Sequence, residues 1–209
     1  MPVSAVLWDF GGVILESPFD AFARYERDND LPDAFLRGLN ARDPDTNAWA
    51  KLERSEVTLD EFCVLFEAEA AAAGHRIDGH AVLSLLSGNV RPEMVEAVRR
   101  CSARIPTGMI TNNFVGFGDG PRRPEIEEIL ALFHTVIESS KVGLRKPDPR
   151  IYELACDALG VSPPEAAFLD DLGINLKPAR ELGMTTIKVV DPAVALRELE
   201  AAVGFPVGP

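Results

Sequence analysis

The sequence is short of cysteine, of positive charge and of long apolar runs, and each shortage excludes a class of protein. Three cysteines, Cys63, Cys101 and Cys156, are too few and too scattered for a disulfide framework or a zinc site. Lys and Arg number 21 against 33 Asp and Glu, a formal net charge of −12, whereas general binding to nucleic acid needs a surplus of positive charge. No apolar run reaches the roughly 18 residues of a membrane span, so we expect no nucleic-acid partner and no membrane partner.

The first ten residues also lack the basic start and the long apolar stretch of a signal peptide. We therefore expect a cytoplasmic protein in which the three cysteines are small core residues. Of its 209 residues, 46% are hydrophobic and 26% are charged, which is enough apolar material for one folded domain, or for one domain with a small insert.

Short apolar runs alternate with helical patterns along most of the chain, and this order predicts an α/β fold. The expected strands are residues 3–8, 105–110, 135–138, 166–169 and 185–190. The expected helices between them are residues 92–102, 124–133, 149–159 and 176–182. Strands that are apolar on both faces, as the first of these runs is, are typical of parallel sheets. We therefore predict a doubly wound parallel sheet with right-handed crossovers.

Residues 16–89 carry helical patterns and no convincing strand, so we expect a small helical cap inserted after the first strand. The domains are then an α/β core of residues 1–15 and 90–209 and a cap of residues 16–89. Thr58, followed three residues later by Glu61, is typical of the start of a helix. Aromatic residues at helical spacing favour simple core packing in the cap, and a pocket for a lipid phosphate stays open as the alternative. These aromatics are Phe19, Phe22, Trp49, Phe62 and Phe66.

Two stretches rich in glycine and proline are expected to be irregular. Residues 116–121, with the sequence GFGDGP, are interpreted as a flexible loop. Residues 204–209 are interpreted as a loose tail at the end of the chain.

Polar side chains gather where the predicted strands end. Asp9 follows the first strand, Thr111 and Asn112 follow the second, and Asp170 and Asp171 follow the strand at 166–169. In an open parallel sheet, the carboxyl ends of the strands are where ligands bind. Each residue alone is more often a turn or a helix cap, so the order and spacing of the whole set carry the argument.

Lys146, just before a predicted helix, adds a positive charge to this set. The set then offers carboxylates for a hard cation, a hydroxyl and an amide for phosphate oxygens, and an ammonium group. Such a group of residues suits a phosphoryl transfer assisted by Mg²⁺, in which positioning and charge neutralisation do most of the catalysis.

Four segments of the chain, in order, resemble the four motifs of the haloacid dehalogenase superfamily. They are AVLWDFGGVI, ITNN, VGLRKPDPRIYELA and AFLDDLGINLKPARELGMTTIKV. The last two are especially similar to the phosphatase domain of soluble epoxide hydrolases and its stand-alone bacterial relatives. The resemblance covers residues 3–14 and about 91–190, and the insert fits the small cap domain of the family by position only.

The resemblance implies a role for each matching residue. Asp9 would be the nucleophile that attacks phosphorus and forms an aspartyl-phosphate. Thr111 and the amide of Asn112 would bind the oxygens of the transferring phosphoryl group. Lys146 would neutralise charge on the nucleophile and on that group.

The resemblance also implies Mg²⁺ as the cofactor. Asp9 and the backbone carbonyl of Gly11 would contribute to the metal site. Asp171 would be a ligand because Asn175 stands four residues further on, where the family places the second residue of its last motif. Asp170 would be a supporting ligand. The expected protein is a Mg²⁺-dependent phosphatase acting on a small phosphorylated metabolite, and the oligomeric state stays open, with a homodimer as one option.

One departure from the family pattern matters for function. Phosphatases of the family usually carry a second Asp two residues after the nucleophile, and Gly11 stands at that position here. That Asp protonates the leaving group and then activates water, a service worth about 10²–10⁴ in rate. Glu16 is a possible substitute, although a solvated glutamate at the hinge to the cap is the favoured interpretation.

Two alternative functions therefore stay open beside the phosphatase. One is a metal-independent dehalogenase or related C–X hydrolase, because a halide leaving group needs no proton. The other is a weakly active or non-catalytic protein that retains the phosphate-binding pocket.

Overall fold

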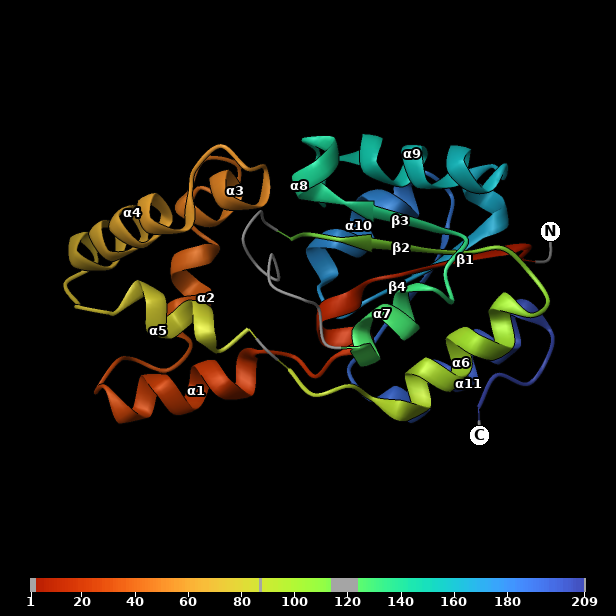
Figure 1. The fold of residues 1–209 in the computed structure, drawn as a ribbon, viewed down its shortest axis with the longest axis horizontal. Helices are drawn as coiled ribbons and strands as arrows, with labels where there is room; N and C mark the ends of the chain where they lie inside the picture. Colours follow the sequence, from red (N-terminus) through yellow and green to blue (C-terminus); the bar gives the residue numbers. More distant parts are fainter. Residues whose placement is uncertain (1–2, 87, 114–123, 209) are drawn as a thin grey trace.

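The centre of the molecule is a five-stranded parallel sheet with the strand order β3-β2-β1-β4-β5 (Figure 1). The computed structural model describes residues 3–86, 88–113 and 124–208. The strands are β1 (Ala5–Trp8), β2 (Thr107–Thr111), β3 (Thr135–Glu138), β4 (Ala166–Asp170) and β5 (Thr185–Lys188). The predicted α/β fold with a doubly wound parallel sheet is confirmed. Because the chain crosses from one side of β1 to the other between β3 and β4, the topological switch point lies at β1.

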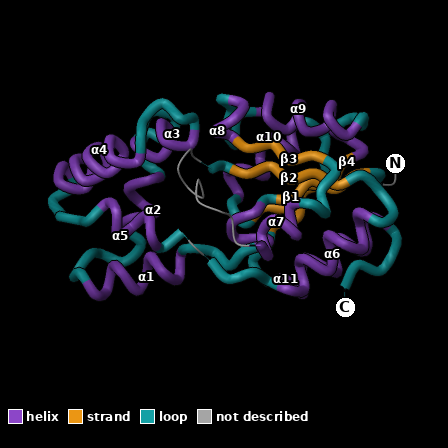
Figure 2. Tube along the Cα trace, viewed as in Figure 1, coloured by secondary structure: helices purple, strands orange, loops and turns teal. Residues whose placement is uncertain are grey.

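Helices cover both faces of the sheet (Figure 2). The helices on one face are α9 (Pro149–Leu159) and α10 (Gly173–Glu181). The helices on the other face are α6 (Pro92–Ser102), α7 (Pro124–Leu130) and α11 (Pro192–Val203), and a short helix, α8 (Ser139–Val142), follows β3. Successive residues of β1 point to opposite faces, so Leu7 joins the α9–α10 core while Val6 and Trp8 join the core on the other side. Buried on both faces, β1 is a rigid base for the residue that follows it.

Five further helices, residues 19–84, stand at the carboxyl ends of the strands and form what we call the helical unit (Figure 1). They are α1 (Phe19–Asp28), α2 (Phe35–Asn40), α3 (Ala48–Glu53), α4 (Leu59–Ala72) and α5 (Gly79–Ser84). Thr58 caps α4 as expected, since its hydroxyl accepts from the backbone of Glu61 while the Glu61 side chain accepts from Thr58.

The aromatic residues of the helical unit pack mainly against one another. Trp49, Phe62 and Phe66 are buried, with ring centroids 4.7 Å apart for Trp49–Phe62 and 5.2 Å apart for Phe62–Phe66. Phe22 is also buried in this cluster, and Phe19 packs against it while partly exposed. The structure therefore favours simple core packing over a lipid-binding pocket at these rings.

The end of the chain differs from its predicted loose tail. Val207 is fully buried, and the backbone N–H groups of Val207 and Gly208 both donate to Oε1 of Glu200 at 2.9 Å. Arg100 of α6 also donates to the carbonyl of Gly208. The prediction was wrong for residues 204–208 because a buried valine and a glutamate of α11 hold them in place. The other predicted irregular stretch, residues 116–121, lies outside the described residues.

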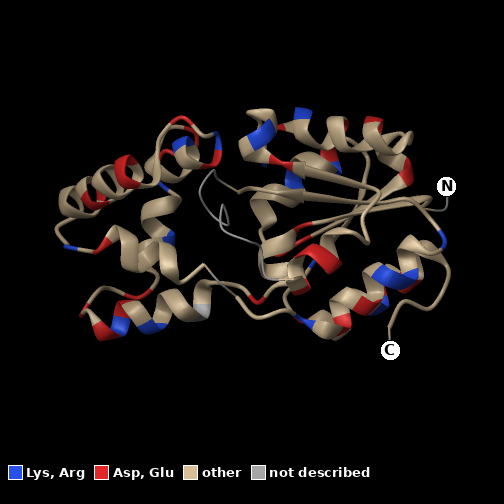
Figure 3. Ribbon diagram, in the orientation of Figure 1, with Lys and Arg blue, Asp and Glu red and all other residues tan. Residues whose placement is uncertain are grey.

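Charged residues of both signs are spread over the helices of both parts of the molecule. Figure 3 shows Lys and Arg interspersed with Asp and Glu in the core and in the helical unit. None of the helices in the described ranges is long and apolar enough to cross a membrane.

Candidate active site

Asp9 lies at the carboxyl end of β1, directly after the fully buried strand. Its Oδ1 accepts from the N–H of Phe10 at 2.7 Å and lies 2.7 Å from Nζ of Lys146. Burial raises the pKa of Asp9, the ammonium of Lys146 opposes the rise, and the nearby carboxylates add to it. Within the described residues, both contacts of the carboxylate fall on Oδ1, so Oδ2 is the oxygen left for a substrate.

Lys146 is the cation at the centre of the site, and its side chain is only 1% exposed. The ammonium nitrogen lies 2.7 Å from Oδ1 of Asp9 and 2.8 Å from Oδ2 of Asp170. Burial disfavours the charged form, but the two carboxylates more than offset this effect and raise the pKa of Lys146. The lysine is therefore a fixed positive charge between the ends of β1 and β4.

Asp170, the last residue of β4, is occupied by protein contacts on both oxygens. Besides Lys146, its carboxylate accepts from the N–H of Leu172 at 2.8 Å and from Nδ2 of Asn175 at 3.0 and 3.1 Å. A fully buried carboxylate is stable only when it is paired and hydrogen-bonded in this way. Asp170 thus holds Lys146 in place, and its predicted role as a supporting metal ligand stays a prediction.

Asp171 is far less occupied. Within the described residues, its carboxylate has one side-chain contact, the hydroxyl of Ser17, which lies 3.4 Å from Oδ2, a long distance for a hydrogen bond. Burial and repulsion from Asp170 raise the pKa of Asp171 to about 6, although Lys146 opposes the rise. A carboxylate with a raised pKa and few partners is a good candidate for a metal ligand.

The site fits a divalent cation. Carboxylate oxygens of Asp9, Asp170 and Asp171 lie within 4.8 Å of one another, and Lys146 balances only one of these three negative charges. Gly12 has a φ of +77°, and a Cβ at this position would stand 2.3 Å from Oδ2 of Asp171. Glycine at position 12 therefore lets the Asp171 carboxylate approach the turn after β1, which brings the acidic group together.

Thr111 and Asn112 lie at the carboxyl end of β2, next to β1 in the sheet. The Thr111 hydroxyl has no hydrogen-bond partner among the described residues and is available to a phosphoryl oxygen. The side chain of Asn112 is engaged with the backbone of Lys146, because Oδ1 accepts from its N–H at 2.8 Å and Nδ2 donates to its carbonyl at 3.0 Å. Asn112 therefore ties the end of β2 to the loop that carries the central cation.

Position 11 offers no side chain where the family usually has an acid. Gly11 has a φ of −69° and a ψ of 132°, and a Cβ there would meet no atom within 4 Å. Glu16, the suggested substitute, is exposed and accepts from Nδ2 of Asn89 at 3.0 Å, where the chain enters and leaves the helical unit. This contact agrees with the interpretation of Glu16 as a hinge residue.

Two residues at the site were missed from the sequence. Ser17 contacts Asp171, and Glu53 at the end of α3 accepts from Arg145 Nε at 2.6 Å and from Asn112 Nδ2 at 3.1 Å. Glu53 and Arg145 are 92 residues apart in the chain, and no local pattern marks the pair.

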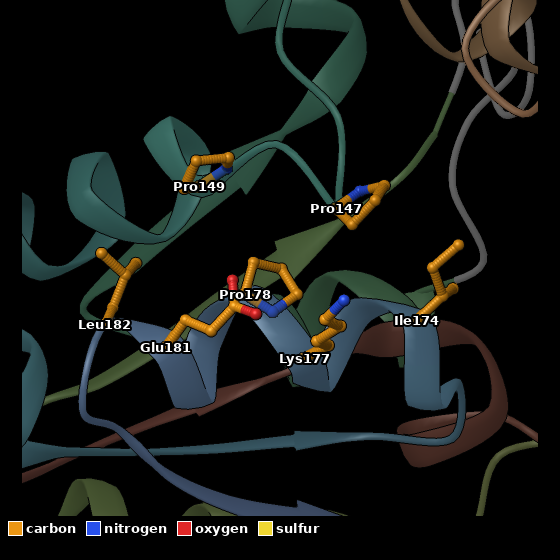
Figure 4. Close-up of a pocket in the computed structure, with 7 residues that line it drawn as sticks. All are labelled: Pro147, Pro149, Ile174, Lys177, Pro178, Glu181 and Leu182. Carbon is orange, nitrogen blue, oxygen red and sulfur yellow. The ribbon is translucent and has the colours of Figure 1, made fainter.

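A separate surface groove lies between the start of α9 and the side of α10 (Figure 4). It is lined by Pro147, Pro149, Ile174, Lys177, Pro178, Glu181 and Leu182. None of the carboxylates of the acidic group lines it, so the groove is distinct from the candidate active site.

The fold and the site define an α/β enzyme with a carboxylate nucleophile candidate, a buried lysine and an acidic group at the switch point of the sheet. A family model described as a haloacid dehalogenase-like hydrolase matches residues 3–183. The chain therefore belongs to the haloacid dehalogenase-like hydrolases, as its four motifs suggest.

Longer proteins contain regions similar to nearly the whole chain. This chain is 37% identical over 213 residues to acyl-CoA dehydrogenase family member 10 of Mus musculus, and the match covers 97% of this chain and 19% of that protein. It is 32% identical over 227 residues to bifunctional epoxide hydrolase 2 of the same organism, covering 100% of this chain and 41% of that protein. The chain thus spans about a fifth of the length of the first relative and about two fifths of the length of the second. Shorter stretches of the chain are similar to phosphatases and to a dehalogenase.

Solved structures show the same fold. A haloacid dehalogenase family enzyme of Bacteroides thetaiotaomicron, in complex with magnesium and inorganic phosphate, superposes with a TM-score of 0.58 at 18% identity. The match covers 89% of this chain and 93% of that chain.

Proposed function

We propose that this hydrolase is a Mg²⁺-dependent phosphatase that acts on a small phosphomonoester through a covalent intermediate on Asp9. The observation that carries the proposal is the set of three carboxylates within 4.8 Å around one buried lysine. A metal-independent dehalogenase has no use for Asp171, whose charge is costly to bury without a cation. The related enzyme from B. thetaiotaomicron holds magnesium and inorganic phosphate, which supports a divalent cation in a site of this fold.

The reaction begins at Oδ2 of Asp9, the oxygen that the described residues leave without a partner. It attacks phosphorus, the bond from phosphorus to the ester oxygen breaks, and the leaving group takes a proton from solvent. Water then attacks the phosphorus of the aspartyl-phosphate, which releases orthophosphate and restores the Asp9 carboxylate. Lys146 stays charged throughout and stabilises the negative charge that gathers on the phosphoryl oxygens, while Thr111 donates to one of them.

Asp9, Asp171 and the carbonyl of Gly11 would hold the metal, with Asp170 in support. A bound Mg²⁺ supplies a Lewis acid that neutralises charge on the phosphoryl group. Asp170 keeps Lys146 beside Asp9, since its two oxygens are engaged with Lys146, Leu172 and Asn175.

Gly11 sets the class of leaving group. With no acid at this position, the departing oxygen leaves as an anion, so a phenolate or a carboxylate departs far more easily than an alkoxide. We therefore expect aryl and acyl phosphates to be better substrates than alkyl phosphates.

The test is a series of phosphate esters whose leaving groups span a wide range of pKa, assayed for phosphate release with Mg²⁺ and with a chelator. Mg²⁺-dependent release that falls steeply as the leaving-group pKa rises supports the proposal. A parallel assay measures halide release from a 2-haloacid in the presence of the chelator. Halide release without metal identifies a dehalogenase, and phosphate binding without turnover identifies a non-catalytic binding protein.

A further inference from the structure

One carboxylate of the helical unit makes direct contact with the loops that carry the candidate active site. Glu53 is the last residue of α3, and its Oε2 lies 2.6 Å from Arg145 Nε and 3.1 Å from Asn112 Nδ2. Arg145 also donates through Nη1 to the carbonyl of Pro44 at 2.7 Å, so it contacts the helical unit at two points. Arg145 and Asn112 both belong to the core. Arg145 directly precedes Lys146 in the chain, and the side chain of Asn112 is hydrogen-bonded to the backbone of Lys146.

Like the two ion pairs of Lys146, the Glu53–Arg145 pair is largely buried, whereas the surface ion pairs of the described residues are not. The two side chains are 14% and 15% exposed, whereas Glu56 in the Arg54–Glu56 pair is 50% exposed. Exposed ion pairs contribute little to the stability of the fold. Breaking a largely buried pair leaves an uncompensated buried charge, which destabilises the folded protein. The pair therefore holds the loop before Lys146 against the helical unit.

Glu53 also supports the orientation of the Asn112 side-chain amide that the backbone N–H and carbonyl of Lys146 select. A carboxylate only accepts hydrogen bonds, so it must face Nδ2 of the amide and not Oδ1. With Nδ2 toward Glu53, Oδ1 is free to accept from the N–H of Lys146 at 2.8 Å, and Nδ2 also reaches its carbonyl at 3.0 Å. The backbone of the central lysine is thus held by an amide that Glu53 helps to keep in place.

We propose that Glu53 is a positioning residue, supplied by the helical unit, which sets the place of Lys146 through Asn112 and Arg145. The inference rests on the proposed phosphatase function, because Lys146 matters there as the cation beside Asp9. Displacing a catalytic group by about 1 Å costs about 100-fold in rate. A loosened Lys146 loop should therefore lower kcat more than it changes KM.

The test compares Glu53→Gln with a matched control. Glutamine keeps the size of the side chain but loses its charge, and its amide no longer favours one orientation of the Asn112 amide. We expect kcat for an aryl phosphate to fall about 10- to 100-fold. The control is Glu56→Gln, which removes the same group from an ion pair of 2.7 Å that lies within the helical unit, and its kcat should stay at the wild-type value.

A second readout does not depend on activity. The N–H of Lys146 donates to Oδ1 of Asn112, so its hydrogen exchange, measured by NMR, reports on the contact that Glu53 is proposed to maintain. Exchange at Lys146 should be faster in Glu53→Gln and unchanged in Glu56→Gln. Glu53→Asp keeps the carboxylate on a side chain that is shorter by one methylene. Its kcat and its exchange rate at Lys146 should lie between those of Glu53→Gln and those of the wild type. This variant replaces Glu53→Gln in the test if Glu53→Gln does not fold.

Each outcome decides the proposal. A lower kcat together with faster exchange, both specific to Glu53, supports it. Wild-type exchange at Lys146 in Glu53→Gln overturns it, whatever happens to kcat, and so does an equal change in the Glu56→Gln control. If the wild type hydrolyses none of the esters, the phosphatase proposal fails, and the exchange rates alone then decide whether Glu53 positions Lys146.

Discussion

Replacing Asp171 with asparagine should stabilise the metal-free protein, although it removes a proposed metal ligand. In the folded protein, burial and the nearby Asp170 raise the pKa of Asp171 from its ordinary 3.8 to about 6. Asparagine has nearly the same shape and cannot ionise, so Asp171→Asn removes the cost of holding this charge in the fold. The hydroxyl of Ser17 can still donate to the amide oxygen.

The expected gain follows from the size of the pKa shift. The folded and unfolded pKa values differ by about 2 units, and each unit corresponds to 1.36 kcal/mol, so ionised Asp171 costs roughly 3 kcal/mol above pH 6. This cost falls to about half at pH 5 and vanishes below the ordinary pKa, because the carboxyl is then protonated in both the folded and the unfolded state. For a chain of this length, the full gain corresponds to a rise in Tm of about 6–12 °C.

Magnesium should largely cancel the stability advantage of Asp171→Asn. At a free Mg²⁺ concentration 100-fold above its Kd, binding stabilises the wild type by about 2.7 kcal/mol, while Asp171→Asn, with weakened affinity, gains much less. Most of the variant's advantage should therefore disappear when Mg²⁺ replaces the chelator, and its activity should fall sharply.

The assay is thermal unfolding at pH 5 and pH 8, with a chelator and with Mg²⁺. Asp157→Asn is the matched control, because Asp157 is exposed on α9 and its replacement should shift Tm little under any of these conditions. The reasoning is wrong if Asp171→Asn lowers the Tm of the metal-free protein at pH 8, or if its gain is the same at both pH values.

Three further substitutions test the neighbouring residues. Asp9→Asn removes the attacking anion and should abolish turnover without loss of the fold; phosphate release at a substantial fraction of the wild-type rate would rule out the covalent route. Gly11→Asp should raise turnover by up to about 10²–10⁴ and flatten the dependence on leaving-group pKa in the ester series; an unchanged dependence in a folded variant would show that another group already supplies the proton. Gly12→Ala should cost about 1–3 kcal/mol and weaken Mg²⁺ binding in calorimetry, whereas Gly11→Ala should unfold at or above the wild-type Tm.

The sheet could be predicted from the sequence because its strands are short apolar runs with polar residues directly after them. The strand at 135–138 was predicted with its observed bounds, and β4 differs from its prediction by one residue. The polar residues at the strand ends could be found for the same reason, since a parallel sheet brings its carboxyl ends to one edge.

What the sequence did not show are contacts between distant segments. Glu53 meets Arg145 only because the helical unit stands at the carboxyl edge of the sheet, and Val207 is buried only because α11 packs against α6. Neither residue has a periodic or local pattern that distinguishes it from a solvated glutamate or a residue of a loose tail.

The two glycines after Asp9 differ in what the fold requires of them. Gly12 has a positive φ, and its missing Cβ makes room for the carboxylate of Asp171, so the backbone and the acidic group both demand glycine there. Gly11 has an ordinary φ of −69° and open space where a Cβ would stand. The fold would therefore accept an aspartate at position 11. The missing acid is then not a consequence of backbone geometry, and it points to a reaction whose leaving group departs without a proton from the protein.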